Sequence, residues 1–149
     1  MLNLDKFRQL FNPLPGNHYL HVSTCRDEIT ELFQEMMIVV DGELNTAYYN
    51  EDNLQFNQPF RARPRDHDML VLKDVFFKHE NPDMLLKLSY LTLANTAHVI
   101  ILEKKGLLDI KEVEDKLEKF EFRVASSIDL IDGYDLIMAK KMHMWGNGL

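Results

Sequence analysis

The sequence predicts an α/β domain with a doubly wound, mostly parallel sheet that ends in a C-terminal antiparallel hairpin. Met69–Leu72 is a continuous apolar run, which is typical of a strand that helices cover on both faces, and Ala97–Leu102 is expected to be a second buried strand. Segments with helical periodicity follow both runs, and strands that alternate with helices build a parallel sheet. Asp132-Gly133 then joins two segments of alternating apolar and polar residues, which is a hairpin signal.

Length and composition fit one domain over residues 1–149, with an N-terminal helix and loop in residues 1–17. No apolar run approaches the roughly 20 residues that span a bilayer, and the N-terminus lacks the features of a signal peptide. The single cysteine excludes an internal disulfide, so a reducing compartment is the default. We therefore expect a cytoplasmic protein with no membrane partner.

Charge and histidine content narrow the function further. The formal net charge is −7, and such a surface repels nucleic acid. Arginines cluster at Arg61, Arg63 and Arg65; a solvated loop is the preferred interpretation, and a site for an anionic substrate is the alternative. His18 and His21 fall on opposite phases of a predicted strand, so we expect no metal site.

In the first half of the chain, helical periodicity predicts a helix over Asp5–Phe11, before a Pro-rich loop. Tyr19–Ser23 is a strand candidate, and a helix with one apolar face begins near Thr24. Met37–Val40 has β-branched members and is expected to be the next strand. A short helix over Glu43–Asn50 follows.

The next strands and helices have clearer boundaries. Gln55–Phe60 is expected to be a strand near an edge, because it contains Pro59. Asp68–Asp74 is the clearest strand of the chain. Asn81 can cap the helix after it, and Asp109 has capping-box spacing before the helix of Leu107–Phe120. The hairpin that follows has the strands Phe122–Leu130 and Tyr134–Met138.

Over about Tyr19 to Met144, the chain resembles the class I S-adenosylmethionine-dependent methyltransferases. The segment Asp68–His79 looks like the family's fourth strand and following loop, and Asn81–Leu91 looks like the next helix. A plain nucleotide-binding fold fits the first part equally well, and the terminal hairpin favours the methyltransferase type of this Rossmann-like fold. The resemblance implies S-adenosylmethionine as the possible cofactor. It places cofactor contacts at five residues: Ser23, Thr24, Cys25, Asp41 and Phe76.

The cofactor loop departs from the family pattern. Where the family has an acid and then glycines, this chain has His21 and then Ser23, Cys25 and Asp27. Asp27 puts negative charge in the first turn of the helix, where the cofactor's own carboxylate would need to bind. Asp41 is expected to end the second strand, where an acid binds ribose hydroxyls; an Asp-Gly turn is the alternative. Cys25 is expected to be a buried, inert thiol.

Three functions follow from this pattern. The first is a methyltransferase-like domain with a weakened or lost cofactor site, which acts by binding or assembly. The second is an active methyltransferase with an atypical cofactor loop. The third is a domain that binds another small ligand in the crevice where the family binds its cofactor. The partner is an unknown small molecule or protein. The apolar tail of Met142, Met144 and Trp145 is expected to dock on the sheet edge or on a partner chain, such as a second copy in a homodimer.

Overall fold

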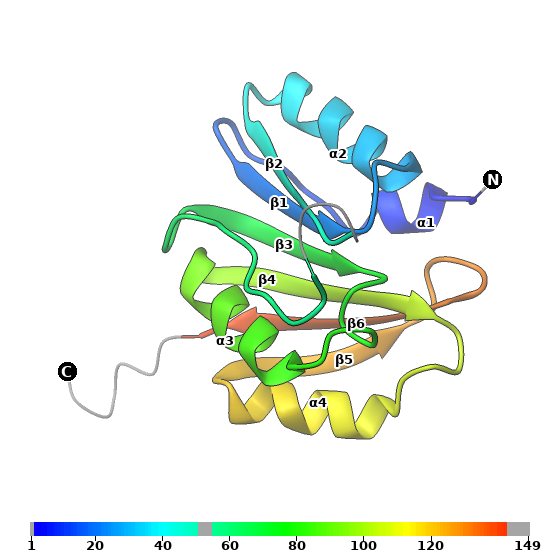
Figure 1. Ribbon diagram of the computed structural model, residues 1–149. Coiled ribbons are helices and arrows are strands. Elements are labelled where there is room, and N and C mark those ends of the chain that lie inside the picture. The colour runs from blue at the N-terminus through cyan, green and yellow to red at the C-terminus, as the bar shows by residue number, and fades with distance from the viewer. Residues whose placement is uncertain (1, 51–54, 143–149) are drawn as a thin grey trace.

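The computed structural model describes residues 2–50 and 55–142. Six strands form one sheet in the order β2-β1-β3-β4-β6-β5 (Figure 1). The first four are parallel where they pair, and β6 is antiparallel to both of its neighbours, β4 and β5. The strands are β1 (His18–Ser23), β2 (Glu43–Tyr48), β3 (His67–Lys73), β4 (Leu93–Lys104), β5 (Phe122–Ile128) and β6 (Tyr134–Lys141).

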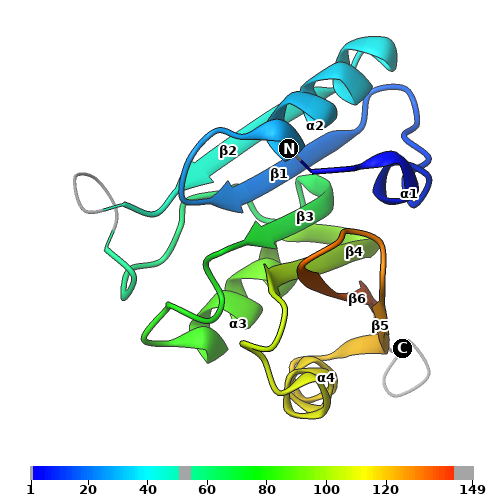
Figure 2. The same cartoon turned by 90° about the vertical axis from the view of Figure 1, so that its right-hand side faces the viewer.

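Helices cover both faces of this sheet (Figure 2). One face packs against α1 (Asp5–Arg8) and α2 (Glu28–Val39), and the other against α3 (Pro82–Thr92) and α4 (Ile110–Lys119). Alternate residues of each central strand enter the two cores, which explains why the middle of each of these strands is mostly apolar. None of the helices in the described residues is both long and apolar enough to cross a membrane.

The two expected strands Tyr19–Ser23 and Asp68–Asp74 both form and lie inside the sheet. Strands β1 and β3 are parallel neighbours, with Tyr19 opposite Met69 and Val22 opposite Leu72. The terminal hairpin also forms, and β6 lies between β4 and β5. This mixed sheet confirms the expected fold class.

The predicted caps are present as well. The side chain of Asn81 accepts a hydrogen bond from the amide of Met84 at 3.2 Å, and Asp109 accepts one from the amide of Glu112 at 3.2 Å. Each cap satisfies an amide that a first helical turn leaves without a partner. These caps set where α3 and α4 begin.

The prediction of a strand at Met37–Val40 is wrong. These residues belong to the last turn of α2 and its C-cap, because Met36 and Met37 continue the buried stripe of that helix. Ile38 and Val39 are 70% and 84% exposed. The second strand is Glu43–Tyr48 instead, where a short helix was expected.

The expected strand at Gln55–Phe60 is also absent; these residues form turns and coil. Gln55, Asn57 and Gln58 are exposed, and Phe60 is buried in the core below α3. Pro59 has no amide to donate to a strand neighbour. As a result β2 is the edge of the sheet. Met144 and Trp145, part of the expected docking tail, lie outside the described residues.

Candidate functional site

The turn between β1 and α2 is closed by Asp27. Helix α2 begins at Glu28 rather than near Thr24, because Asp27 is its cap. One carboxylate oxygen of Asp27 accepts hydrogen bonds from the amides of Ile29 and Thr30, at 3.0 and 3.1 Å. In return the Asp27 amide donates to the Thr30 hydroxyl at 3.1 Å. This reciprocal capping box occupies two amides at the helix N-terminus.

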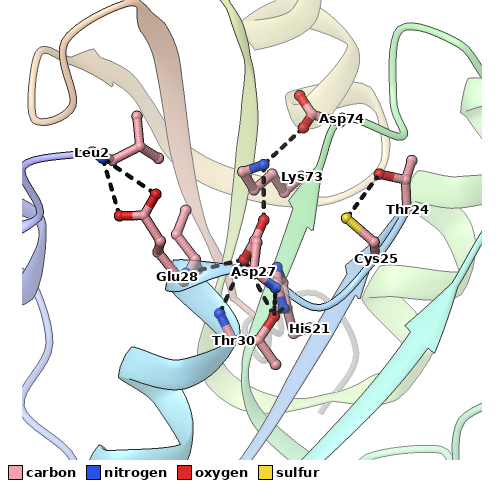
Figure 3. Close-up of polar contacts among 10 residues, drawn as sticks. Leu2, His21, Thr24, Cys25, Asp27, Glu28, Thr30, Lys73 and Asp74 are labelled. Atoms are coloured by element: carbon pink, nitrogen blue, oxygen red, sulfur yellow. Dashed lines mark hydrogen bonds and ion pairs between the residues drawn. The ribbon is translucent and has the colours of Figure 1, made fainter.

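The second carboxylate oxygen of Asp27 forms an ion pair with Lys73, the last residue of β3. Lys73 Nζ lies 2.9 Å from Asp27 Oδ2 and 2.8 Å from Asp74 Oδ2 (Figure 3). Lys73 is only 7% exposed, so these two carboxylates take the place of the water that would otherwise solvate its charge. The ring of Tyr134 lies 5.3 Å from the same ammonium group.

The charges of this cluster hold one another in their ionised forms. Burial by itself would lower the pKa of Lys73, but its hydrogen bonds to Asp74 and Asp27 raise that pKa above its ordinary value. Burial alone would raise the pKa of Asp27, and the hydrogen bonds with Lys73 and the Thr30 amide lower it below the ordinary value. Lys73 and Asp27 are therefore both charged near neutral pH.

A buried histidine lies beneath the turn. His21 is fully buried, and its Nδ1 lies 3.1 Å from the Thr30 hydroxyl oxygen. Burial lowers the pKa of His21 to about 4, although Asp27 opposes the shift. The ring is therefore neutral at pH 7. Among the described residues, neither Nε2 of His21 nor the hydroxyl of buried Ser23 has a hydrogen-bond partner.

Three of the five predicted site residues lie in this turn. Ser23 ends β1 and is fully buried. Thr24 is half-buried and its hydroxyl lies 4.0 Å from the Cys25 sulfur. Cys25 is exposed, so the expectation of a buried thiol is wrong.

Asp41 lies at the other end of the sheet. It follows α2 and precedes β2, so the prediction that it ends a strand is wrong. Glu43 pairs with His18, the first residue of β1, and six strand residues span roughly 20 Å. Asp41 therefore lies far from Ser23. The carboxyl end of β2 is Tyr48, and the amide of buried Tyr49 donates to the Ser23 carbonyl at 2.8 Å.

Phe76 belongs to the core and also lines a small cavity. Its side chain is 6% exposed and packs in the cluster below α3 and α4. The cavity has a volume of about 290 Å³, and Phe77, Leu108 and Lys116 are among the residues that line it. Larger cavities of about 520–530 Å³ open elsewhere on the described surface, and none of the five predicted residues lines them.

Sequence reasoning did not single out Lys73 as a site residue. Its signal was a lysine at the end of an otherwise apolar strand, next to Asp74. A buried cation in such a place needs carboxylates around it. That Asp27 is one of them depends on the pairing of β1 with β3, which the sequence only suggested.

Comparisons with known proteins identify the fold of this chain. No family model matches the chain, and no curated protein sequence matches it. Solved structures do match. Haemonchus contortus phosphoethanolamine N-methyltransferase 2, in complex with S-adenosyl-L-methionine, has a TM-score of 0.72 at 10% identity. The alignment covers 94% of this chain and 52% of that chain, so this chain spans about half the length of that enzyme.

Two further matches cover nearly all of both chains. A SAM-dependent methyltransferase from Aquifex aeolicus has a TM-score of 0.70 at 15% identity, over 93% of this chain and 90% of that chain. The putative methyltransferase of Haloferax volcanii, in complex with the Trm112 methyltransferase activator, has a TM-score of 0.69 at 10% identity, over 94% and 89%. At these identities the likeness is one of architecture. The chain has the fold of the class I S-adenosylmethionine-dependent methyltransferases.

Proposed function

We propose that this chain is a methyltransferase-like domain whose S-adenosylmethionine site is weakened or lost, and that it acts by binding or assembly. The observation that carries the proposal is the double engagement of Asp27. One of its oxygens caps α2, and the other pairs with Lys73. The turn where this fold holds its cofactor is thus satisfied by the protein's own groups.

Occupied amides weaken any anion site at this helix. A helix N-terminus attracts anions because its first amides lack partners. Here the amides of Ile29 and Thr30 already donate to Asp27. A cofactor carboxylate would have to displace that cap, and the cap itself contributes about 1 kcal/mol.

The charge balance opposes the cofactor carboxylate as well. Lys73 is the buried cation of the cluster, and Asp27 and Asp74 both pair with it. The three groups together carry a net negative charge. Because Lys73 screens Asp27, direct repulsion is weaker than an isolated carboxylate would produce. Occupation of the turn is the stronger block.

Two other contacts that the resemblance implied are changed. An acid at the end of the second strand binds ribose in related dinucleotide sites, and here Tyr48 holds that position. Where the family has an acid at the first strand, neutral His21 is buried against Thr30. Both changes favour a role in binding over methyl transfer.

Calorimetric titration of the full chain with S-adenosylmethionine and with S-adenosylhomocysteine tests the proposal. We expect no saturable heat for either compound at concentrations up to about 1 mM, which corresponds to a binding free energy weaker than about −4 kcal/mol. A micromolar dissociation constant for either compound would overturn the proposal and establish the active enzyme as the better hypothesis. Thermal unfolding with and without each compound gives an independent measurement of binding.

A further inference from the structure

A cavity of about 530 Å³ lies at the end of the sheet where the parallel strands begin. It is formed by the last turn of α3, the start of β4, the end of β6 and the residues just before β3. Figure 1 shows the start of β4 and the end of β6 at the same end of the sheet. The Asp27 cluster lies at the opposite end, because Lys73 is the last residue of β3. The cavity is therefore separate from the turn between β1 and α2.

Lys141 brings a buried ammonium group to this cavity. It is the last residue of β6, lines the cavity and is 5% exposed. Its Nζ donates hydrogen bonds to the carbonyls of Tyr90 and Leu93, at 2.6 and 2.7 Å, and lies 4.3 Å from the centre of the Tyr90 ring. The Tyr90 carbonyl belongs to the last turn of α3, where carbonyls lack helical partners. An ammonium group has three N–H donors, so one is left without an oxygen acceptor among the residues described.

This ammonium has no counter-ion in the part of the chain that the structure describes. Lys73 is buried to a similar degree, and it lies between two carboxylates at 2.9 and 2.8 Å. Lys141 has two carbonyls in their place, and carbonyls solvate a charge without neutralising it. Burial lowers the pKa of Lys141 below its ordinary value, and the nearby charge of Arg65 lowers it further. The positive charge of Lys141 is thus unbalanced.

Arg65 adds a second positive charge to the same cavity. Its amide donates to the Leu91 carbonyl at 2.8 Å, which holds its backbone against the end of α3. Its side chain is exposed, and it forms no ion pair with any described residue. The adjacent carboxylate, Asp66, lies instead 3.6 Å from Nδ1 of His18 and lines a different cavity. The described lining therefore contains two cations and no carboxylate.

The rest of the lining suits the body of a small organic molecule. The pairing of β3 with β4 passes from His67–Leu93 to Met69–His98, so residues 94–97 of β4 lie opposite Asp68 alone. Such bulges are common next to binding sites, because they bend the strand and redirect its side chains. Pockets for small molecules combine apolar surface with a few polar groups. Here the apolar surface comes from Pro64, Tyr90, Leu91 and Ala94, and Asn95 adds an amide.

We propose that this cavity binds a small organic anion, in which a carboxylate or a phosphate monoester is attached to an apolar or aromatic body. The anionic group would accept a hydrogen bond from Lys141 and pair with the guanidinium of Arg65. The body would pack against the ring of Tyr90 and the side chain of Leu91. Such a ligand supplies the counter-ion that Lys141 lacks. The inference does not depend on S-adenosylmethionine, because the Asp27 cluster lies at the other end of β3.

Titration of the full chain with single-ring compounds tests this inference. The probes are benzoate and phenyl phosphate, and benzamide is the uncharged control with the shape of benzoate. NMR spectra of the 15N-labelled protein follow the backbone amides of the cavity lining. We expect saturable shifts there for at least one anion, with a dissociation constant of about 1 mM or lower, which is a normal affinity for so few atoms. Benzamide should bind at least about tenfold more weakly, because it loses the charge-assisted contacts.

Matched variants locate the binding site. Arg65→Gln removes one charge from the lining and should weaken binding of the anion about tenfold. Arg63→Gln removes the same charge two residues away, but Arg63 lines the different cavity beside His18, so the affinity should not change. Lys141→Met should abolish saturable binding, and circular dichroism reports whether this variant is folded without its contacts to the end of α3.

The pKa of Lys141 gives a measurement on the unmodified protein, which remains decisive if Lys141→Met does not fold. Because a bound anion favours the charged form of a neighbouring amine, saturation with the tighter-binding anion should raise the pKa of Lys141. NMR of the lysine side-chain nitrogens over a pH series measures this shift. A purely structural lysine at the end of α3 would keep the same pKa with and without the anion.

Four results would overturn the inference. The first is no saturable shift for either anion at concentrations up to about 10 mM. The second is equal affinity for benzoate and benzamide, which would show that charge does not select the ligand. The third is an equal loss of affinity in Arg65→Gln and Arg63→Gln, and the fourth is a pKa of Lys141 that the anion leaves unchanged.

Discussion

Lys73 Nζ lies 2.9 Å from the carboxylate of Asp27 and so ties the end of β3 to the cap of α2. The two residues are far apart in the sequence, and they meet because β1 and β3 are neighbours. The pair fills the turn between β1 and α2, which contains the predicted cofactor contacts Ser23, Thr24 and Cys25.

Lys73→Met should destabilise the protein by about 3 kcal/mol, because breaking a buried ion pair leaves carboxylates without their counter-ion. Asp27 and Asp74 would then face each other with no cation between them. The free energy of unfolding from urea titration measures the loss. Lys111→Met is the control, since Lys111 forms an exposed pair with Asp115 on α4, and it should unfold at nearly the same urea concentration as the wild type. Equal stability of the two variants would show that the cluster is not a stabilising contact.

Asp27→Gly should improve binding of S-adenosylmethionine over that of the wild type. The change frees the amides of Ile29 and Thr30 and removes a carboxylate from the turn. It should also reduce stability, by about 1 kcal/mol for the lost cap and more for the partner that Lys73 loses. Calorimetric titration measures binding, and circular dichroism confirms that the variant is folded.

Asp27→Asn is the matched control for that experiment, because asparagine keeps the cap and removes the charge. If the glycine variant binds and the asparagine variant does not, occupation of the amides is the block. If both bind equally, charge is the block. If the glycine variant is folded but does not bind S-adenosylmethionine, the backbone path of residues 23–27 excludes the cofactor by itself.

Sequence reasoning succeeded where local and tertiary preferences agree. The apolar runs of β3 and β4, the caps Asn81 and Asp109 and the hairpin turn were all predictable, because each has one stable solution. It failed at Met37–Val40, since a short apolar run suits a buried strand and the end of a helix equally well. It failed again at β2, whose half-exposed residues lack the apolar character of a central strand.

The site was predictable only in part. Ser23, Thr24 and Cys25 follow from the position of β1, and the capping role of Asp27 follows from its place before the apolar face of α2. Asp41 was misplaced because its assignment depended on the wrong second strand. The Lys73 pair could not be derived, because the sequence does not fix which distant carboxylate a buried lysine will meet.

Gly42→Ala should destabilise the protein by about 2 kcal/mol, because an added methyl group in a packed site forces its neighbours apart. A Cβ atom at Gly42 would clash with the Asn17 carbonyl oxygen and lie 2.8 Å from the Met37 sulfur. The neighbouring change Asp41→Gly is the control. Asp41 has a φ of 53°, which glycine adopts freely, so this variant should be at least as stable as the wild type. Thermal unfolding compares the two variants. If Gly42→Ala is as stable as the wild type, the turn into β2 can shift to accommodate the methyl group.

Stability should fall as the pH is lowered from 6.5 towards 4, because His21 must be neutral in the folded protein. Its pKa is about 4 in the fold against an ordinary 6.5. The unfolded chain therefore binds the extra proton between these values, and the stability that is present above pH 6.5 is lost as the pH falls. For one fully buried group, a shift of this size corresponds to about 3 kcal/mol. Urea titrations between pH 7 and pH 4.5 measure the slope.

His21→Gln isolates this contribution, because glutamine can still hydrogen-bond the Thr30 hydroxyl but does not titrate. The pKa values of His67 and His98 are also lowered by burial, and they act in the same direction in both proteins. Burial raises the pKa of Glu103. Protonation of this carboxyl in the fold therefore adds stability as the pH falls, which opposes the effect of the histidines. Because these groups are common to both chains, the difference between the two pH profiles reports His21 together with its effect on Asp27, whose pKa the histidine also lowers. We expect the variant to lose markedly less stability than the wild type over this interval. Parallel profiles would mean that the His21 ring accepts a proton in the folded protein without loss, and that the polar groups under the turn can rearrange around a charge.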